Sequence, residues 1–277
     1  MEYINLGKNK ISVLGIGTYP LSGEVLNNIL STAVDVGYNL IDTAHKYNNE
    51  KDIGNFIASL NIKNNIYIET KLSTTQLTTK TFLGIKYKSK TVKQALKESC
   101  RKLGVDILDI YLLHSPYNCV KLYGKLIKLR NNGMVDFIGG CRMEISHLKE
   151  IYSRYNEYPS INQIEVHPFY SNKKLIDFCR NNGIVVEARS PFTHGDALEE
   201  FIGNSILSNI AKSHNKTVPQ IILRWIIQQG VVAIPRSSYS AHIRENGDIF
   251  DFYLTNYEMQ MIDSLNQNKS YGCLTSK

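Results

Sequence analysis

Eight short apolar runs, rich in the β-branched side chains of valine and isoleucine, recur along this chain of 277 residues. They are almost continuously apolar and do not alternate with polar residues, which is typical of strands buried on both faces of a parallel sheet. The runs cover residues 13–18, 39–42, 66–71, 107–114, 135–139, 161–166, 184–188 and 231–234. We therefore expect one parallel sheet whose connecting segments cover its faces.

The segments between these runs have the spacing and the end signals of helices. Thr91 with Gln94, and Thr217 with Gln220, have the spacing of a capping box at a helix start. Glycines at positions 37, 104, 133, 183 and 230 close helical stretches shortly before the next run, where left-handed C-terminal caps are common. Eight strand–helix units in a chain of this length predict an α/β fold of the (β/α)8 TIM barrel type.

Residues 3–13 predict an N-terminal β-hairpin, which we expect to close the floor of the barrel. An open doubly wound sheet is the competing fold, but Gly15 and Gly17 lead into Thr-Tyr-Pro and do not complete a Gly-x-Gly-x-x-Gly motif. No linker or shift in composition divides the chain, so we expect residues 1–277 to form a single domain. Residues 73–90 are expected to form a loop, and residues 203–217 an additional helix.

Composition and charge narrow the class of protein. No window approaches the roughly 18 to 20 consecutive apolar residues of a membrane span, and the first residues lack the order of a secretory signal, so we expect a cytoplasmic protein without a membrane partner. The five cysteines are scattered and lack metal-ligand spacing, which favours reduced thiols and no metal site. The net charge of +7 would suit nucleic acid, but without a recognisable reading helix or RNA-binding signature we expect no such partner.

Polar residues end or follow three consecutive predicted strands. Asp42 ends the second strand, Tyr47 follows in its loop, Lys71 ends the third strand and His114 ends the fourth. In a parallel barrel the carboxyl ends of the strands meet at one mouth, where active sites lie. Each residue alone has an ordinary structural explanation, such as a helix cap, a packed ring, a solvated amine or a turn. Together they indicate a catalytic site.

These four side chains make chemical sense as a device for carbonyl reduction. A phenol has an ordinary pKa near 10, and a nearby ammonium lowers this value. Lys71 is expected to supply that charge, Asp42 to hold Lys71, and His114 to hydrogen-bond the substrate oxygen. Tyr47 would then act as a tuned general acid.

At these residues the sequence resembles the aldo-keto reductases, and the resemblance covers nearly the whole chain. The run Gly37-Tyr-Asn-Leu-Ile-Asp-Thr-Ala-His-Lys-Tyr-Asn-Asn-Glu50 is similar to the family signature, with Asn48 where glycine is usual. Lys71 and His114 match the other two positions of the family tetrad. Segments at 161–168, 234–237, 243–246 and 265–272 follow in the family order.

The resemblance implies NADPH-dependent reduction of an aldehyde or ketone, with hydride from the nicotinamide and a proton from Tyr47. It implies that NADPH binds extended, without a Rossmann domain, and that a basic residue meets the 2′-phosphate, a role for which a guanidinium is well shaped. The implied cofactor contacts are Cys141, Arg142, Gln163, Arg189, Ser190, Phe192, Arg236, Ser237, His242, Glu245 and Asn246.

Several of these positions depart from the family pattern. Cys141-Arg142 stands where Ser-Asn grips the carboxamide, and His242 replaces an arginine near the adenine, which weakens the preference for NADPH over NADH. Arg189 replaces the aromatic residue that stacks on the nicotinamide. Because the oxidised ring is positive, we expect Arg189 to be paired with a carboxylate, either Glu187 or Glu165, or with the ligand.

The resemblance places Tyr19, His45 and Ser115 at the substrate pocket. Ser115 stands where tryptophan is frequent, which predicts an open, polar pocket for a small carbonyl substrate. Lysines in the loop before the third helix and at the start of that helix would attract an anionic substrate, although an ordinary solvated loop has the same composition. They are Lys80, Lys86, Lys88 and Lys90 in the loop and Lys93 at the start of the helix.

The alternative function is that of a redox sensor or regulatory protein that binds NADP(H) with little turnover. The departures at the cofactor positions favour it, whereas the complete tetrad favours a working reductase. As to assembly, we expect a monomer or a weak homo-oligomer.

Overall fold

The computed structural model describes residues 1–60, 66–78, 80–82, 85–87, 89–195 and 197–272. Its centre is an eight-stranded parallel sheet in which neighbours follow the order β12-β11-β10-β9-β8-β5-β4-β3. The strands are β3 (Gly15–Gly17), β4 (Leu40–Asp42), β5 (Tyr67–Leu72), β8 (Leu108–Leu113), β9 (Val135–Cys141), β10 (Ile161–Glu165), β11 (Val185–Arg189) and β12 (Val232–Ile234).

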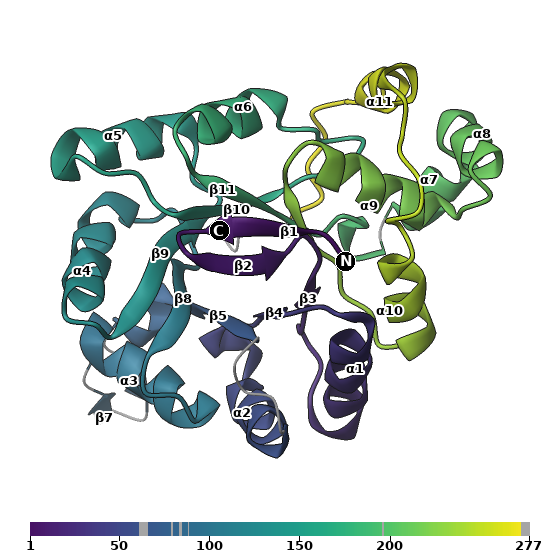
Figure 1. The fold of residues 1–277 in the computed structure, drawn as a ribbon. Helices are drawn as coiled ribbons and strands as arrows, with labels where there is room; N and C mark the ends of the chain where they lie inside the picture. The colour runs from purple at the N-terminus through teal and green to yellow at the C-terminus, as the bar shows by residue number, and fades with distance from the viewer. Residues whose placement is uncertain (61–65, 79, 83–84, 88, 196, 273–277) are drawn as a thin grey trace.

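The sheet closes on itself between its first and last strands. Leu14 and Ala233 form a parallel bridge, and the Gly17 N–H donates to the Pro235 carbonyl at 3.0 Å. Figure 1 shows the helices arranged around the sheet. The α/β fold of the (β/α)8 TIM barrel type is thereby confirmed.

The helices in the described part of the chain are α1 (Gly23–Val36), α2 (Glu50–Ser59), α3 (Val92–Leu103), α4 (Cys119–Asn131), α5 (Ile145–Tyr155), α6 (Lys173–Asn181), α7 (Leu198–Gly203), α8 (Ser205–Ser213), α9 (Val218–Gln228), α10 (Ser240–Gly247) and α11 (Asn256–Asp263). Both predicted capping boxes are formed, by Thr91 with Gln94 at α3 and by Thr217 with Gln220 at α9. Each satisfies backbone donors that the first turn of a helix leaves free.

The N-terminal hairpin lies across one end of the barrel (Figure 1). It pairs β1 (Tyr3–Leu6) with β2 (Asn9–Ser12) in antiparallel register. Leu6 and Ile11 pack in one apolar cluster with strand residues that include Leu40, Ile110 and Val232. The hairpin therefore closes the floor of the barrel, as the sequence predicts.

Two connections differ in detail from expectation. Within the expected loop at 73–90 the backbone forms a short hairpin, β6 (Lys80–Phe82) with β7 (Ile85–Tyr87). The additional helix expected after the seventh strand is α8, and α7 precedes it. No helix among the described residues is long and apolar enough to cross a membrane.

Candidate active site

Asp42 and Lys71 form the buried base of the site at the carboxyl ends of β4 and β5. The Lys71 side chain is fully buried, Asp42 is 5% exposed, and the Lys71 ammonium donates to Asp42 Oδ1. A second hydrogen bond runs from Lys71 Nζ to the Thr43 carbonyl at 2.9 Å. A buried charge is tolerated when it is paired and hydrogen-bonded in this way, so the ammonium is held in a fixed position.

Tyr47 lies in a short 3-10 turn, η1 (His45–Tyr47), that a buried asparagine anchors. Asn49 accepts from Thr43 Oγ1 at 2.6 Å and donates to the Leu21 carbonyl at 2.9 Å. Asn48 between them has φ 58, a left-handed conformation that asparagine tolerates. These contacts fix the turn that carries the phenol.

The four predicted residues are brought together. Lys71 Nζ lies 5.5 Å from the centre of the Tyr47 ring. The Tyr47 and His114 rings lie edge to face, with centres 5.8 Å apart. Tyr19, one of the predicted substrate residues, packs against Tyr47, with ring centres 5.0 Å apart.

The pKa of Tyr47 differs from the expected direction. Burial raises its pKa well above the ordinary value, and the neighbouring Lys71 lowers it by less. Asp42, which neutralises much of the lysine charge, also raises it. The attraction of the ammonium for a phenolate is therefore present, as expected, but in the free protein burial outweighs it.

His114 is held as a neutral imidazole. Burial first, and then the positive charge of Lys71, lower its pKa to about 3. Its Nδ1 is buried and makes no hydrogen bond within the described residues. A neutral ring has one N–H donor and one acceptor, so His114 can donate one hydrogen bond to a ligand at neutral pH.

Two buried glutamates, Glu69 and Glu187, adjoin this base. Glu187 is predicted only as a possible partner of Arg189, and Glu69 is not predicted as a site residue. Gln163 Nε2 donates to Glu69 Oε1 at 2.7 Å, to Asp42 Oδ1 at 3.0 Å and to Glu187 Oε2 at 3.1 Å. Glu69 Oε1 also lies 3.5 Å from Lys71 Nζ. The residue alternation of a strand could have found Glu69, because residues two apart share one face.

Arg189 is paired with a carboxylate, as the sequence predicts. Its Nη2 lies 3.4 Å from Glu165 Oε2, and the two residues are register partners on β11 and β10. Of the two candidates, Glu165 on the neighbouring strand is therefore the partner. Glu165 also accepts from Ser270 Oγ at 2.7 Å and from the Tyr271 N–H at 2.6 Å, so it links the barrel mouth to the C-terminal segment.

Cys141 and Arg142, at the end of β9, contact Gln163 and the His114 backbone. Cys141 Sγ is buried, 3.8 Å from Gln163 Oε1. Arg142 has φ 58, and its Nη2 donates to the His114 carbonyl at 3.2 Å. Within the described residues Arg142 forms no ion pair, so its charge is available beside His114.

The other predicted cofactor residues gather after β11 and β12. Phe192 is half-buried against the core, and Ser190 precedes it with φ 54. Asn246 is buried, whereas the side chain of Arg236 is exposed. Ser237 Oγ lies 3.2 Å from His242 Nδ1 within this group. Glu245 Oε1 accepts from Oγ1 of Thr217, the residue before α9, at 2.6 Å.

The other two predicted substrate residues, His45 and Ser115, and the lysine loop contact residues other than the four predicted catalytic ones. His45 Nδ1 lies 3.9 Å from Glu50 Oε2. Ser115 Oγ accepts from the Tyr117 N–H at 3.3 Å. Lys90 pairs with Glu98 of α3, whereas the side chains of Lys80, Lys86 and Lys88 lie outside the described residues.

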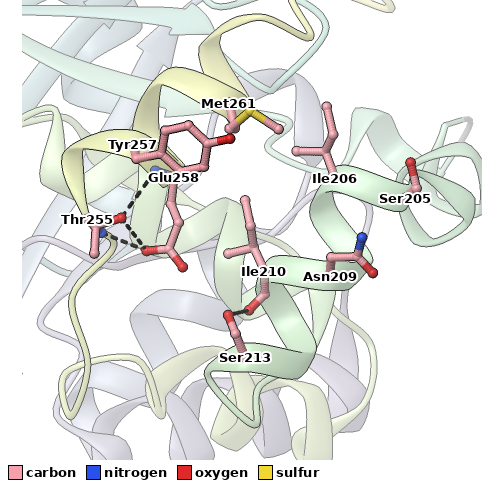
Figure 2. Close-up of a pocket in the computed structure, with 9 residues that line it drawn as sticks. All are labelled: Ser205, Ile206, Asn209, Ile210, Ser213, Thr255, Tyr257, Glu258 and Met261. Atoms are coloured by element: carbon pink, nitrogen blue, oxygen red, sulfur yellow. Dashed lines mark hydrogen bonds between the residues drawn. The ribbon is translucent and has the colours of Figure 1, made fainter.

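A groove between α8 and α11 is separate from this site (Figure 2). It has a volume of about 380 Å³, and none of the predicted catalytic or cofactor residues lines it. Its wall is formed by Ser205, Ile206, Asn209, Ile210, Ser213, Thr255, Tyr257, Glu258 and Met261.

The fold and the tetrad together define a class of enzyme. The chain belongs to the aldo/keto reductase family, whose family model matches residues 12–267. It is therefore an oxidoreductase, and the resemblance stated from the sequence is confirmed.

Individual members of the family are similar to it over most of their length. It is 35% identical to the glyoxal reductase of Bacillus subtilis (strain 168), covering 93% of this chain and 90% of that protein. It is 31% identical to the methylglyoxal reductase DkgA of Escherichia coli (strain K12), covering 95% and 93%. The structure of a Bombyx mori aldo-keto reductase in complex with NADP has a TM-score of 0.84 at 28% identity, covering 97% of this chain and 94% of that chain.

Proposed function

We propose that this chain reduces a small aldehyde or ketone to an alcohol with NADPH, and that Tyr47 donates the proton. The observation that carries the proposal is the buried contact of Lys71 with Asp42 beside the Tyr47 and His114 rings. When bound, NADPH supplies the hydride. The residues of the chain therefore have to orient the carbonyl group and protonate its oxygen.

The proton transfer uses the four residues in order. His114, neutral because its pKa is about 3, donates a hydrogen bond to the carbonyl oxygen. Tyr47 gives its hydroxyl proton to that oxygen as negative charge develops there. Lys71 then stabilises the phenolate and can return a proton to it, while Asp42 holds the ammonium in place. A preorganised donor set of this kind lowers the barrier in a dry site.

The residues after β9 to β12 fit a dinucleotide phosphate. Arg189 Nε is buried without a hydrogen-bond partner in the described part of the chain, and Arg236 presents an exposed guanidinium of the kind that binds a phosphate. Gln163 Nε2 is occupied by carboxylates. Its Oε1, which accepts only a weak contact from the Cys141 thiol at 3.8 Å, therefore has a second lone pair for the nicotinamide carboxamide. NADPH is favoured over NADH by the guanidinium of Arg236.

A small dicarbonyl compound is the substrate class that we propose. Sequence similarity to a glyoxal reductase and a methylglyoxal reductase supports it. Ser115 leaves the mouth open beside His114, and Arg142 offers a positive charge there. An anionic group next to the carbonyl would therefore be accepted.

The test is to follow NADPH absorbance with glyoxal, methylglyoxal and a panel of other aldehydes and ketones, comparing the natural protein with Tyr47→Phe. We expect the variant to lose about 10²- to 10⁴-fold in turnover, the usual contribution of a general acid, while its Kd for NADPH stays within about twofold. Equal rates would contradict the role of Tyr47. Tight NADPH binding with no turnover of any carbonyl would favour the sensor function instead.

A further inference from the structure

Glu69 and Glu187 face each other across the barrel interior although their strands, β5 and β11, are not neighbours in the sheet. Their exposed fractions are 0% and 1%. Both accept a hydrogen bond from Gln163 Nε2, at 2.7 and 3.1 Å, and Asp42 accepts from the same nitrogen. An amide nitrogen carries two hydrogens, so three carboxyl groups share fewer donors than they need.

The charges around this pair do not balance if every group is ionised. Lys71 is a cation in contact with Glu69 of the pair and with Asp42. The other titratable groups facing it are the Cys141 thiol, whose pKa burial raises to about 12, and the Tyr47 phenol. Three carboxylates against one ammonium would leave two uncompensated negative charges in a dry interior, which is strongly unfavourable.

One oxygen atom marks where a proton would be held. Glu69 Oε2 is buried and has no hydrogen-bond partner among the described residues. Burial first, and then Glu187, raise the pKa of Glu69 well above its ordinary value, and burial raises the pKa of Glu187 to about 7. A proton on Glu69 would turn the unsatisfied acceptor into a donor and remove the excess charge.

We propose that Glu69 and Glu187 share one proton while the bound nicotinamide is neutral, and release it when the ring is positively charged. The inference rests on the proposed function, in which Gln163 contacts the nicotinamide carboxamide. A positive charge beside Gln163 stabilises the second carboxylate of the pair, whereas a neutral ring does not.

The released proton has a defined route to the reaction. Glu69 Oε1 lies 3.5 Å from Lys71 Nζ. As Tyr47 gives its proton to the substrate oxygen, Lys71 gives one to the phenolate and Glu69 gives one to Lys71. The substrate gains one proton and the acid pair loses one, which it regains from solvent when neutral cofactor replaces oxidised cofactor.

Proton release on cofactor binding tests the proposal directly. Calorimetric titrations at pH 7 in two buffers of different ionisation enthalpy count the protons released with NADP⁺ and with NADPH. Both cofactors carry the same phosphates, so the difference between the two proton counts reports the effect of the charge on the nicotinamide ring. We expect the wild type to release about 0.5 to 1 proton more with NADP⁺ than with NADPH, as for one group with a pKa near neutral pH.

Variants locate the group that releases the proton. Glu69→Gln keeps the shape but cannot ionise, so the difference should fall to near zero while both cofactors bind. Glu187→Gln should also reduce the difference to near zero, and it replaces Glu69→Gln as the test if that variant does not fold. Glu50→Gln is the matched control, because Glu50 is 1% exposed but accepts from Thr70 Oγ1 at 2.8 Å and lies 3.5 Å from Lys102; it should keep the wild-type difference.

The outcomes separate this inference from the proposed function. Equal proton counts for the two cofactors in the wild type would overturn it, as would an undiminished difference in both glutamine variants. If neither cofactor binds the wild type, the proposed function itself is wrong. If both bind without any difference in proton release, only the shared proton is wrong.

Discussion

Arg189 and Glu165 stand side by side on β11 and β10, with Arg189 Nη2 3.4 Å from Glu165 Oε2. The same carboxylate accepts from Ser270 and Tyr271. Although burial opposes its ionisation, hydrogen bonds from His167, Ser270 and the Tyr271 N–H lower the pKa of Glu165 to about 2. One ionised carboxylate thus both neutralises the arginine at the barrel mouth and holds the C-terminal segment against it.

Glu165→Gln should loosen the C-terminal segment. The amide keeps the size of the side chain but loses the charge-assisted hydrogen bonds, which are roughly twice as strong as neutral ones. Trypsin should therefore cut after Lys269, which is exposed, several-fold faster than in the wild type, as followed by mass spectrometry. Cleavage after Lys8, in the exposed turn of the hairpin, is the internal control and should not change. Equal rates at Lys269 would show that Glu165 does not hold the segment.

Lys71→Met should destabilise the fold by removing the cation from a buried carboxylate cluster. Breaking a buried ion pair costs about 3–5 kcal/mol, and urea unfolding at pH 8 measures the loss. The double variant with Asp42→Asn should be less destabilised than Lys71→Met alone, because the unpaired carboxylate is gone. Lys173→Met, which breaks the exposed pair with Asp263 at 3.1 Å, should cost less than about 1 kcal/mol. A similar cost for the two lysines would contradict the importance of burial.

Glu187→Gln should change how stability depends on pH. Burial raises the pKa of Glu187 from 4.5 to about 7, so the folded protein binds this proton more tightly than the unfolded chain does. The stabilisation is complete below pH 4.5 and is lost as the pH rises to about 7. Glutamine does not ionise, so the variant does not lose this stabilisation as the pH rises. The unfolding free energy of the variant minus that of the wild type should therefore increase by about 3 kcal/mol between pH 4.5 and 7.

Urea midpoints at half-unit steps from pH 4.5 to 8 measure this effect. Asp109, whose pKa burial raises to about 6, acts in the same direction but is present in both proteins and cancels. Parallel pH profiles for the wild type and the variant would mean that Glu187 is ionised throughout this range, contrary to its raised pKa.

Arg142→Asn should reduce the preference for anionic substrates. The arginine charge lies beside His114 without an ion-pair partner in the described part of the chain, and asparagine tolerates the left-handed backbone at this position. The kcat/KM for a carboxylated aldehyde such as glyoxylate should fall about tenfold, the effect of about 1.4 kcal/mol, while that for glyoxal should change by less than about twofold. Arg101→Asn, exposed on α3, is the control. An equal loss for both substrates would point to a structural role.

Most of the fold can be predicted from the sequence because burial on both faces leaves an unmistakable pattern. All eight barrel strands lie in the predicted runs, with shifts of one or two residues at their ends. The β6–β7 hairpin is missed because residues 73–90 lack both an alternating pattern and a strong two-residue turn signal. Closure of the barrel, seen in the Leu14–Ala233 bridge, is predicted by the count of eight strand–helix units and by no sequence motif.

The candidate site is predicted less completely, and the reasons are physical. The proximity of Asp42, Tyr47, Lys71 and His114 can be predicted because each ends a strand, or lies in the loop after one, at the same mouth. Glu69 is missed because the sequence does not show which residues of other strands face a glutamate within an apolar run. The pKa of Tyr47 is misjudged because a spacing in sequence predicts the neighbouring ammonium but not how deeply the phenol is buried.

The hairpin at the floor of the barrel affects how protons reach the buried carboxyl groups. Leu6 and Ile11, packed among apolar strand residues, close the end below Glu69 and Glu187. We therefore expect protons to reach those carboxyl groups chiefly through the mouth that cofactor and substrate also use. A filled mouth should therefore slow the exchange of protons between the two carboxyl groups and the surrounding buffer without preventing the release that accompanies binding of the oxidised cofactor.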